Sequence, residues 1–147
     1  MSETRETYVV DILGGSRAIG GRNAPTERDV RDRIRTGLPY RSFEMVRERF
    51  QLSMPEAAGA LGVPLRTLAR RRIEKKLATD ESDRLYRLAR VAAHAVRVLG
   101  TEEKAAAWLR RPNRSLGGET PLAVLDTDIG ARETDEALGR LEHGIVG

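Results

Sequence analysis

Cysteine is absent from this 147-residue chain, and histidine and aromatic residues are scarce: there are two His, one Trp, three Tyr and two Phe. Without cysteine, a disulfide framework and thiolate metal ligands are excluded. His94 and His143 are far apart in the sequence, and a metal site needs several convergent ligands, so we expect no metal and no other cofactor. No apolar run reaches the ~18–20 residues that span a membrane, and the first residues are not a signal peptide. We therefore expect a cytoplasmic protein without membrane contact.

Motifs for catalysis or nucleotide binding fail on their spacing. Gly15 and Gly20 have the spacing that begins a phosphate-binding loop, but residues 21–22 are Gly and Arg where Lys and Ser or Thr would contact phosphate and magnesium. The acids between positions 126 and 133 lack the turn glycine and the closing glutamate of a calcium loop. No nucleophile with an adjacent base is visible. We therefore expect that the chain is not an enzyme.

Charge is distributed unevenly along the chain. The formal net charge is +4, yet residues 113–147 contain three Arg and seven Asp or Glu, a net charge of −4, which leaves +8 on residues 1–112. Segments of opposite sign suggest two different partners. A pI near 9.9 with clustered arginines favours nucleic acid as one of them. Apolar residues are 39%, below the usual ~45–50%, so we also expect self-association as a homodimer to supplement a small core.

The spacing of apolar residues predicts an all-α fold. Residues 1–25 are expected to be irregular, with one short strand over residues 8–13. Apolar residues then recur three and four apart. Helices are expected to begin at Thr26, Ser42, Ser53, Val63, Thr79 or Asp80, Thr101, and Thr134 or Asp135. We divide the chain into an N-terminal arm and helix (1–36), a helix-turn-helix domain (37–99) and a small helical domain (100–147), with Trp108 as a core anchor.

Residues 54–73 have the spacing of a helix-turn-helix. Ala58 is small enough for two helices to cross closely, and Gly62 allows the turn between them. Val63 and Leu68 are expected to fix the second helix to the core. Position 72 is Arg where an apolar closing residue is common, so we expect residue 73, an Ile, to supply that contact.

The second helix of this motif is the candidate DNA-reading element. Residues 66–76 contain six cations and one acid. We expect Arg66 and Arg70 to contact base edges and the remaining cations to contact phosphate, which would make the affinity fall steeply with salt. The expected DNA-binding residues are Arg66, Thr67, Arg70, Arg71, Arg72, Lys75 and Lys76. A helical pair that packs only against protein is the alternative.

Beyond this motif, several runs resemble a known family of antitoxins. The runs are residues 63–71, 80–90, 108–109, 112–113, 116–118, 120–122, Thr127, Gly130 and 138–144. In combination they resemble the Xre/MbcA/ParS antitoxins, and the resemblance covers roughly residues 34–147.

The resemblance implies a protein with two partners. Its helix-turn-helix domain would bind the operator DNA of its own operon, and its C-terminal domain would bind a RES-domain toxin, an enzyme that consumes NAD⁺. The C-terminal tail would cover the toxin's active site, and members of the family self-associate. The residues implied in toxin binding are Asn113, Leu116, Gly117, Gly118, Thr120, Pro121, Leu138, Leu141, Glu142, His143, Gly144, Ile145, Val146 and Gly147.

The residue types of the C-terminal segment agree with this implication. Asn113 can satisfy loop backbone groups, and Thr120 followed by Pro121 can begin a short helix. At the end of the chain, Ile145 and Val146 have no later helix to cover them, and uncovered apolar ends are typical of interaction sites. Two alternatives stay open: the tail folds back onto the chain's own core, or the protein is a dimeric helix-turn-helix repressor without a toxin partner.

Overall fold

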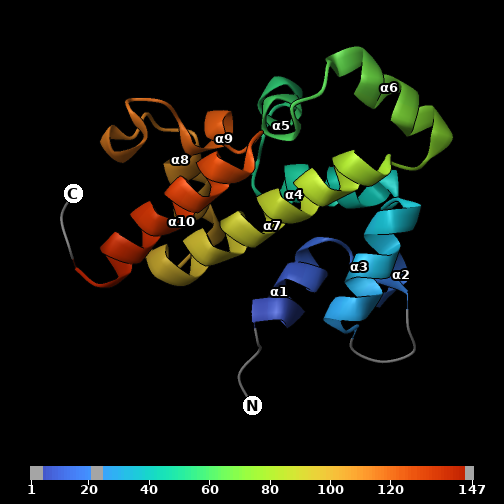
Figure 1. The fold of residues 1–147 in the computed structure, drawn as a ribbon, viewed down its shortest axis with the longest axis horizontal. Coiled ribbons are helices and arrows are strands. Elements are labelled where there is room, and N and C mark those ends of the chain that lie inside the picture. Colours follow the sequence, from blue (N-terminus) through green and yellow to red (C-terminus); the bar gives the residue numbers. More distant parts are fainter. Residues whose placement is uncertain (1–4, 21–24, 145–147) are drawn as a thin grey trace.

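The computed structural model describes residues 5–20 and 25–144, and these form helices joined by turns, with no strand among them (Figure 1). The all-α prediction is confirmed. The α-helices are α1 (Arg5–Ile12), α2 (Ser16–Ile19), α3 (Glu27–Thr36), α4 (Tyr40–Arg49), α5 (Met54–Leu61), α6 (Leu65–Glu74), α7 (Thr79–Leu99), α8 (Glu102–Leu109), α9 (Pro121–Val124) and α10 (Asp128–Glu142), and the 3₁₀ helix is η1 (Arg114–Leu116).

The long helix α7 organises the molecule. Its 21 residues span about 31 Å at 1.5 Å per residue, and α1, α3, α5, α8 and α10 all pack against it (Figure 1). The expected apolar stripe is buried, with Leu85, Leu88, Ala89 and Ala92 each no more than 1% exposed. One hydrophobic cluster extends from α1 to α10 along this helix, so both ends of the molecule share a single core. Trp108 packs against that cluster, as expected, while remaining partly exposed.

Side-chain caps set three of the helix starts that the sequence predicts. The hydroxyls of Thr26, Ser53 and Thr101 each accept a hydrogen bond from the backbone N–H three residues later. The first two form capping boxes, because the acid three residues on also accepts a bond from the cap's own N–H. At α7 the cap residue is Ala78, and Glu81 accepts from its N–H at 2.8 Å.

The start predicted at Ser42 is wrong: α4 begins at Tyr40, and Ser42 is a buried residue within it whose hydroxyl donates to Leu13 O at 2.6 Å.

The expected strand over residues 8–13 is wrong, because most of this segment lies in helix α1. Its β-branched and aromatic residues favour a strand locally. In the structure Val9, Ile12 and Leu13, three and four residues apart, are at most 2% exposed and belong to the common core. Burial against α7 and α4 outweighs the local preference. The N-terminal segment is therefore part of the folded body.

The last helix begins six residues earlier than the earlier of the two predicted starts. It starts at Asp128, and its cap is Thr127, whose hydroxyl accepts a hydrogen bond from Gly130 N–H at 3.0 Å. Thr134 is instead a buried mid-helix residue that donates its hydroxyl to Gly130 O at 2.8 Å. The sequence does not indicate this start, because Gly130 lies near the beginning of the helix and glycine is a poor helix former.

Candidate functional site

Helices α5 and α6 form the helix-turn-helix that the spacing predicts. Ala58 is 5% exposed, and Gly62 adopts the left-handed conformation, with φ 65°, that turns the chain between the helices. Leu68 is fully buried and Val63 is partly buried against the core. Helix α6 therefore packs through one side only, and its opposite side faces solvent.

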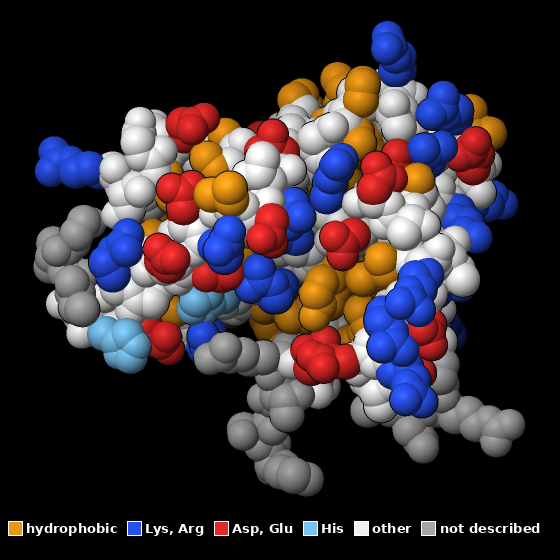
Figure 2. Space-filling model, in the orientation of Figure 1, with side chains coloured by type: hydrophobic (Ala, Val, Ile, Leu, Met, Phe, Trp, Pro, Cys, Tyr) orange, Lys and Arg blue, Asp and Glu red, His pale blue; other side chains and the backbone are white. Residues whose placement is uncertain are grey.

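The solvent-facing side of α6 and the turn after it are strongly cationic. Arg66, Arg70, Arg72, Lys75 and Lys76 are all exposed, while Thr67 is half-buried. Figure 2 shows Lys and Arg side chains gathered over this end of the molecule and along α3. The structure thus brings five of the predicted DNA-binding cations to one accessible surface.

Arg71 differs from its neighbours because it is bound within the chain. Its Nε and Nη2 donate to the two carboxylate oxygens of Glu81 at 2.7 and 3.0 Å, and Nη1 reaches Glu74 at 3.0 Å. The Glu81 side chain is only 5% exposed. Burial alone raises the pKa of Glu81, but the hydrogen bonds from Arg71 and from the Ala78 N–H hold that pKa below its usual range. Arg71 therefore fastens α6 to α7, and its predicted phosphate contact would compete with this pairing.

The expected closing contact from Ile73 is wrong, since this side chain is 82% exposed. Lys75 ends α6 in a left-handed conformation, with φ 64°. The chain then turns so that Leu77, 2% exposed, enters the core and its N–H bonds to Leu38 O at 2.9 Å. Leu77 supplies the closure, and Ile73 is left on the open face of the helix.

At the other end of the molecule, residues 113–120 form a compact loop. Asn113 Oδ1 accepts from Ser115 N–H at 2.9 Å, and the backbone of Asn113 pairs with Glu119 and Gly118. Gly117 and Gly118 both have positive φ, 68° and 86°, which favours glycine at this turn. Thr120 then caps α9 by accepting from Ala123 N–H at 3.1 Å. The backbone roles expected for Asn113 and Thr120 are confirmed.

The predicted toxin-binding residues divide into buried and accessible ones. Leu116, Pro121 and Leu138 are buried in the chain's own packing, so their side chains support this surface and do not form it. Leu141 is 46% exposed, and Glu142, His143 and Gly144 are exposed beside it. Ile145, Val146 and Gly147 lie outside the described residues.

One further residue of this end, Ile129 on α10, was not anticipated. Its side chain is 63% exposed next to the cap of α10. An isolated Ile just after a helix cap carries no sequence signal that distinguishes exposure from burial. It adds an apolar contact point to the C-terminal end.

Paired side chains join α7 to α10. Asp135 accepts from Arg90 Nη1 at 2.7 Å and contacts His94 Nδ1 at 2.9 Å. Burial raises the pKa of Asp135, but the bonds from His94 and Arg90 outweigh it and lower that pKa overall. His94 is thus a packing residue that hydrogen-bonds to Asp135. Throughout residues 5–20 and 25–144, no group of three or more His, Asp or Glu could hold a metal ion.

Two family models match this chain, one on each end of α7. The model described as the antitoxin Xre-like helix-turn-helix domain matches residues 29–90, and the one described as the antitoxin Xre/MbcA/ParS C-terminal toxin-binding domain matches residues 94–144. The chain belongs to the Xre antitoxin family.

Curated relatives agree with this family assignment. The chain is 37% identical over 115 residues to "Antitoxin Xre" of Photorhabdus laumondii, covering 77% of the chain and 78% of the relative. It is 34% identical over 116 residues to "Antitoxin Xre" of Yersinia enterocolitica, covering 78% of each. It is 42% identical over 84 residues to "Antitoxin Xre" of Pseudomonas putida, covering 56% of the chain and 52% of the relative.

The boundary between the two Xre-family matches falls within α7. That helix therefore belongs to both units and fixes one relative to the other. Helices α1 and α2 lie outside both matches, although α1 contributes to the shared core. In the described part of this Xre-family chain, no helix is long and apolar enough to cross a membrane.

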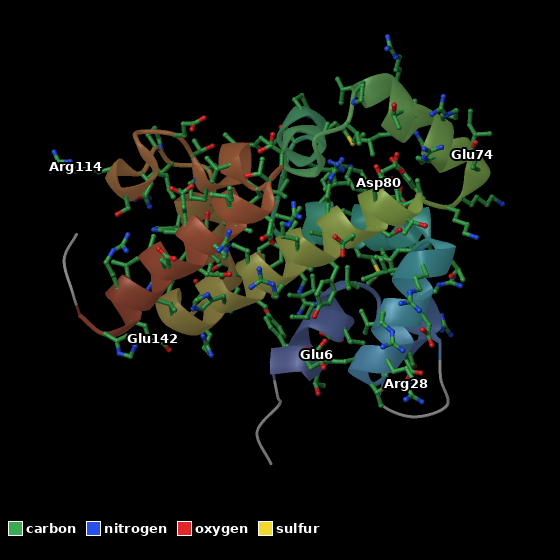
Figure 3. All side chains as sticks on the ribbon, in the orientation of Figure 1. Glu6, Arg28, Glu74, Asp80, Arg114 and Glu142 are labelled. Atoms are coloured by element: carbon green, nitrogen blue, oxygen red, sulfur yellow. The ribbon has the colours of Figure 1, made fainter. Side chains whose placement is uncertain are left out.

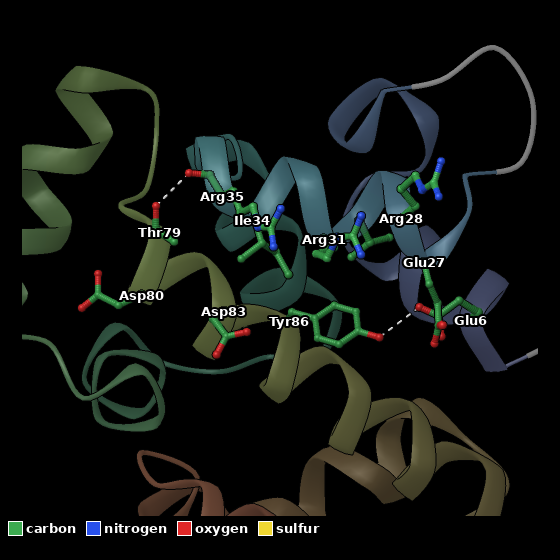
Figure 4. Close-up of a pocket in the computed structure, with 11 residues that line it drawn as sticks. Glu6, Glu27, Arg28, Arg31, Ile34, Arg35, Thr79, Asp80, Asp83 and Tyr86 are labelled. Carbon is green, nitrogen blue, oxygen red and sulfur yellow. Dashed lines mark hydrogen bonds between the residues drawn. The ribbon is translucent and has the colours of Figure 1, made fainter.

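A groove between α1, α3 and α7 was not predicted from the sequence. It encloses about 980 Å³ over an apolar floor that includes Ile34 and Tyr86 (Figure 4). Arginines of α3 form one wall, and Asp80 and Asp83 of α7 lie across from them. Tyr86 donates its hydroxyl to Glu6 at 2.9 Å and closes one end of the groove. No single segment of the sequence could predict this groove, because its walls come from segments about 50 residues apart.

Proposed function

We propose that this Xre-family antitoxin neutralises a RES-domain, NAD⁺-consuming toxin with its C-terminal end and represses its own operon by binding operator DNA with α6. The observation that supports this most is the separation of two unlike surfaces by α7. Figure 3 places Glu74 of α6 at one end of the molecule and Arg114 and Glu142 at the other. Each surface can therefore engage a partner without covering the other.

The DNA-facing side of the proposal rests on Arg66, Arg70, Arg72, Lys75 and Lys76. They surround the accessible face of α6, where a recognition helix would enter the major groove. In this arrangement Arg66 and Arg70 contact base edges and the other cations contact phosphate. Arg71 takes part by holding α6 in place. If these three cations contact phosphate, affinity falls roughly 40-fold between 50 and 200 mM salt.

The toxin-facing side of the proposal combines the 113–120 loop with the end of α10. The loop offers Asn113, Gly117, Gly118 and Thr120 on a surface stiffened by its own hydrogen bonds. Leu141, Glu142, His143 and Gly144 lead into the terminal tripeptide. We assign Ile145 and Val146 to apolar contacts in the toxin cleft.

Removal of residues 145–147 tests this function. We expect inhibition of the toxin to weaken about 100-fold, because two apolar side chains no longer enter its cleft. Operator binding should be unchanged, since α6 lies at the opposite end. Growth and cellular NAD⁺ in cells that co-express a RES-domain toxin measure the first effect, and a DNA-binding titration measures the second.

The matched control for the truncation is Arg70→Met, which should weaken operator binding and leave growth rescue intact. Full rescue by the truncated chain would overturn the tail mechanism. If the full chain gives no rescue and the truncation costs operator binding, the alternative is favoured: a dimeric helix-turn-helix repressor without a toxin partner.

Self-association as a homodimer is also part of the proposal. The groove of Figure 4 supports it through its opposed walls, basic on α3 and acidic on α7. Two copies related by a two-fold axis would place each basic wall against the partner's acidic wall, as an isologous interface requires.

A further inference from the structure

One side of the exposed surface of α6 carries an apolar stripe. Leu65, Ala69 and Ile73 occur four residues apart and therefore line one stripe of the helix. Leu65 is 49% exposed, Ile73 is 82% exposed, and Ala69 is exposed between them. We call these three residues the α6 stripe. It contains two of the four exposed large hydrophobic side chains in the described part of the chain.

Cations border the α6 stripe on both sides. Helical spacing places Arg66 and Arg70 along one edge and Arg72 along the other, and all three are exposed. Hydrophobic side chains are visible among the blue ones at this end in Figure 2. Elsewhere on α6, buried Leu68 and the Arg71–Glu81 pair hold the helix against the core. The stripe is therefore presented outward by a helix whose rotation is fixed.

The charge around the stripe selects its partner. A second copy of this face would bring arginines against arginines, which disfavours a symmetric contact. A polyanion with apolar groups at its centre fits both features at once. The major groove of DNA has this pattern, because phosphates flank the base edges and thymine carries a methyl group on its major-groove edge.

We propose that the α6 stripe recognises thymine by contact with its C5-methyl group. This inference rests on the proposed DNA-binding function of α6 and adds the base that the helix selects. Ile73 and Leu65 each cover a methyl group, and the small side chain of Ala69 lets the helix approach the base edges between them. Arg66 and Arg70 act beside the stripe on hydrogen-bonding base edges.

Uracil-substituted DNA tests the inference, because deoxyuridine lacks only the methyl group of thymidine. The probe is a duplex enriched from a randomised library by the purified full chain, with each thymine of the enriched motif replaced in turn by deoxyuridine. We expect at least one replacement to weaken binding about fourfold, the effect of one methyl group leaving an apolar contact. Ile73→Ala or Leu65→Ala should weaken binding to the thymine duplex and abolish the difference at its own position.

Two further variants separate the possible outcomes. Ile129→Ala removes an exposed Ile from the other end of the molecule and should leave both duplexes unaffected. Arg70→Met should weaken both duplexes equally. If Arg70→Met weakens binding but neither stripe variant alters the response to deoxyuridine, the thymine inference is overturned and DNA binding by α6 stands. If no duplex is enriched, or Arg70→Met has no effect, both the inference and the proposed DNA-binding role of α6 fail.

Discussion

Replacement of Gly130 by alanine is expected to lower the free energy of unfolding by about 3–4 kcal/mol. A Cβ atom at this position would lie 1.7 Å from the carbonyl oxygen of Val124 and 2.6 Å from its carbonyl carbon. Both are backbone atoms, so no side-chain rotation can relieve the overlap. Helix α10 would have to move away from α9, and with it the Thr127 cap and part of the core.

Gly139 on the same helix provides the matched control. A Cβ there meets nothing within 4 Å, and alanine is a better helix former than glycine, so Gly139→Ala should stabilise the chain by about 0.5–1 kcal/mol. Urea denaturation of both variants measures the difference. Equal shifts for the two would show that α10 does not approach the Val124 carbonyl as closely as described.

Loss of Arg71 is the second large effect that we expect. Arg71→Met leaves the carboxylate of Glu81 buried and without its cation, which should lower the free energy of unfolding by about 3 kcal/mol. The exposed neighbour gives the control: Arg72→Met should weaken DNA binding and leave stability nearly unchanged. If the two variants lose equal DNA affinity with no loss of stability in either, Arg71 is an ordinary phosphate contact and its structural role is wrong.

The pH dependence of the free energy of unfolding also tests the Arg71–Glu81 pair. The pKa of Glu81 is lowered in the folded chain, so its contribution is complete above the unfolded value of about 4.3 and is lost as pH falls through the folded pKa. In Arg71→Met the lone buried carboxyl has the opposite tendency, because burial raises its pKa. The stability gap between variant and natural chain should therefore be widest near neutral pH and shrink on acidification.

The double variant Arg71→Met with Glu81→Leu removes both charges. It should recover a large part of the lost stability, since an apolar pair avoids the uncompensated carboxylate. Recovery should stay incomplete, because Glu81 also accepts the Ala78 N–H.

Local patterns predicted the helix-turn-helix well. Ala58, Gly62 and Leu68 lie within a few residues of the turn between α5 and α6. Their roles therefore follow from side-chain size, backbone freedom and spacing alone. The helix caps at Ser53 and Thr101 follow from the same kind of short-range rule. These features could be placed without coordinates because their physical cause lies within a few residues.

The features that escaped sequence reasoning depend on distant contacts. Residues 8–13 have strand-forming residue types, but most of them are helical because α7 and α4 bury them. Ile73 was expected inside, but the turn at Lys75 places Leu77 there instead. Arg71 could not be separated from the other cations of α6, because its partner Glu81 is known only once α6 and α7 are packed. Gly130 carries no local sign of the Val124 carbonyl beside it.

The central claim is that two surfaces at opposite ends of α7 bind different partners independently. Native mass spectrometry of the full chain with a RES-domain toxin and its operator duplex tests this most directly. The account predicts a single species that contains chain, toxin and DNA together when both partners are saturating. Separate chain–toxin and chain–DNA species, each displaced by the other partner, would contradict it.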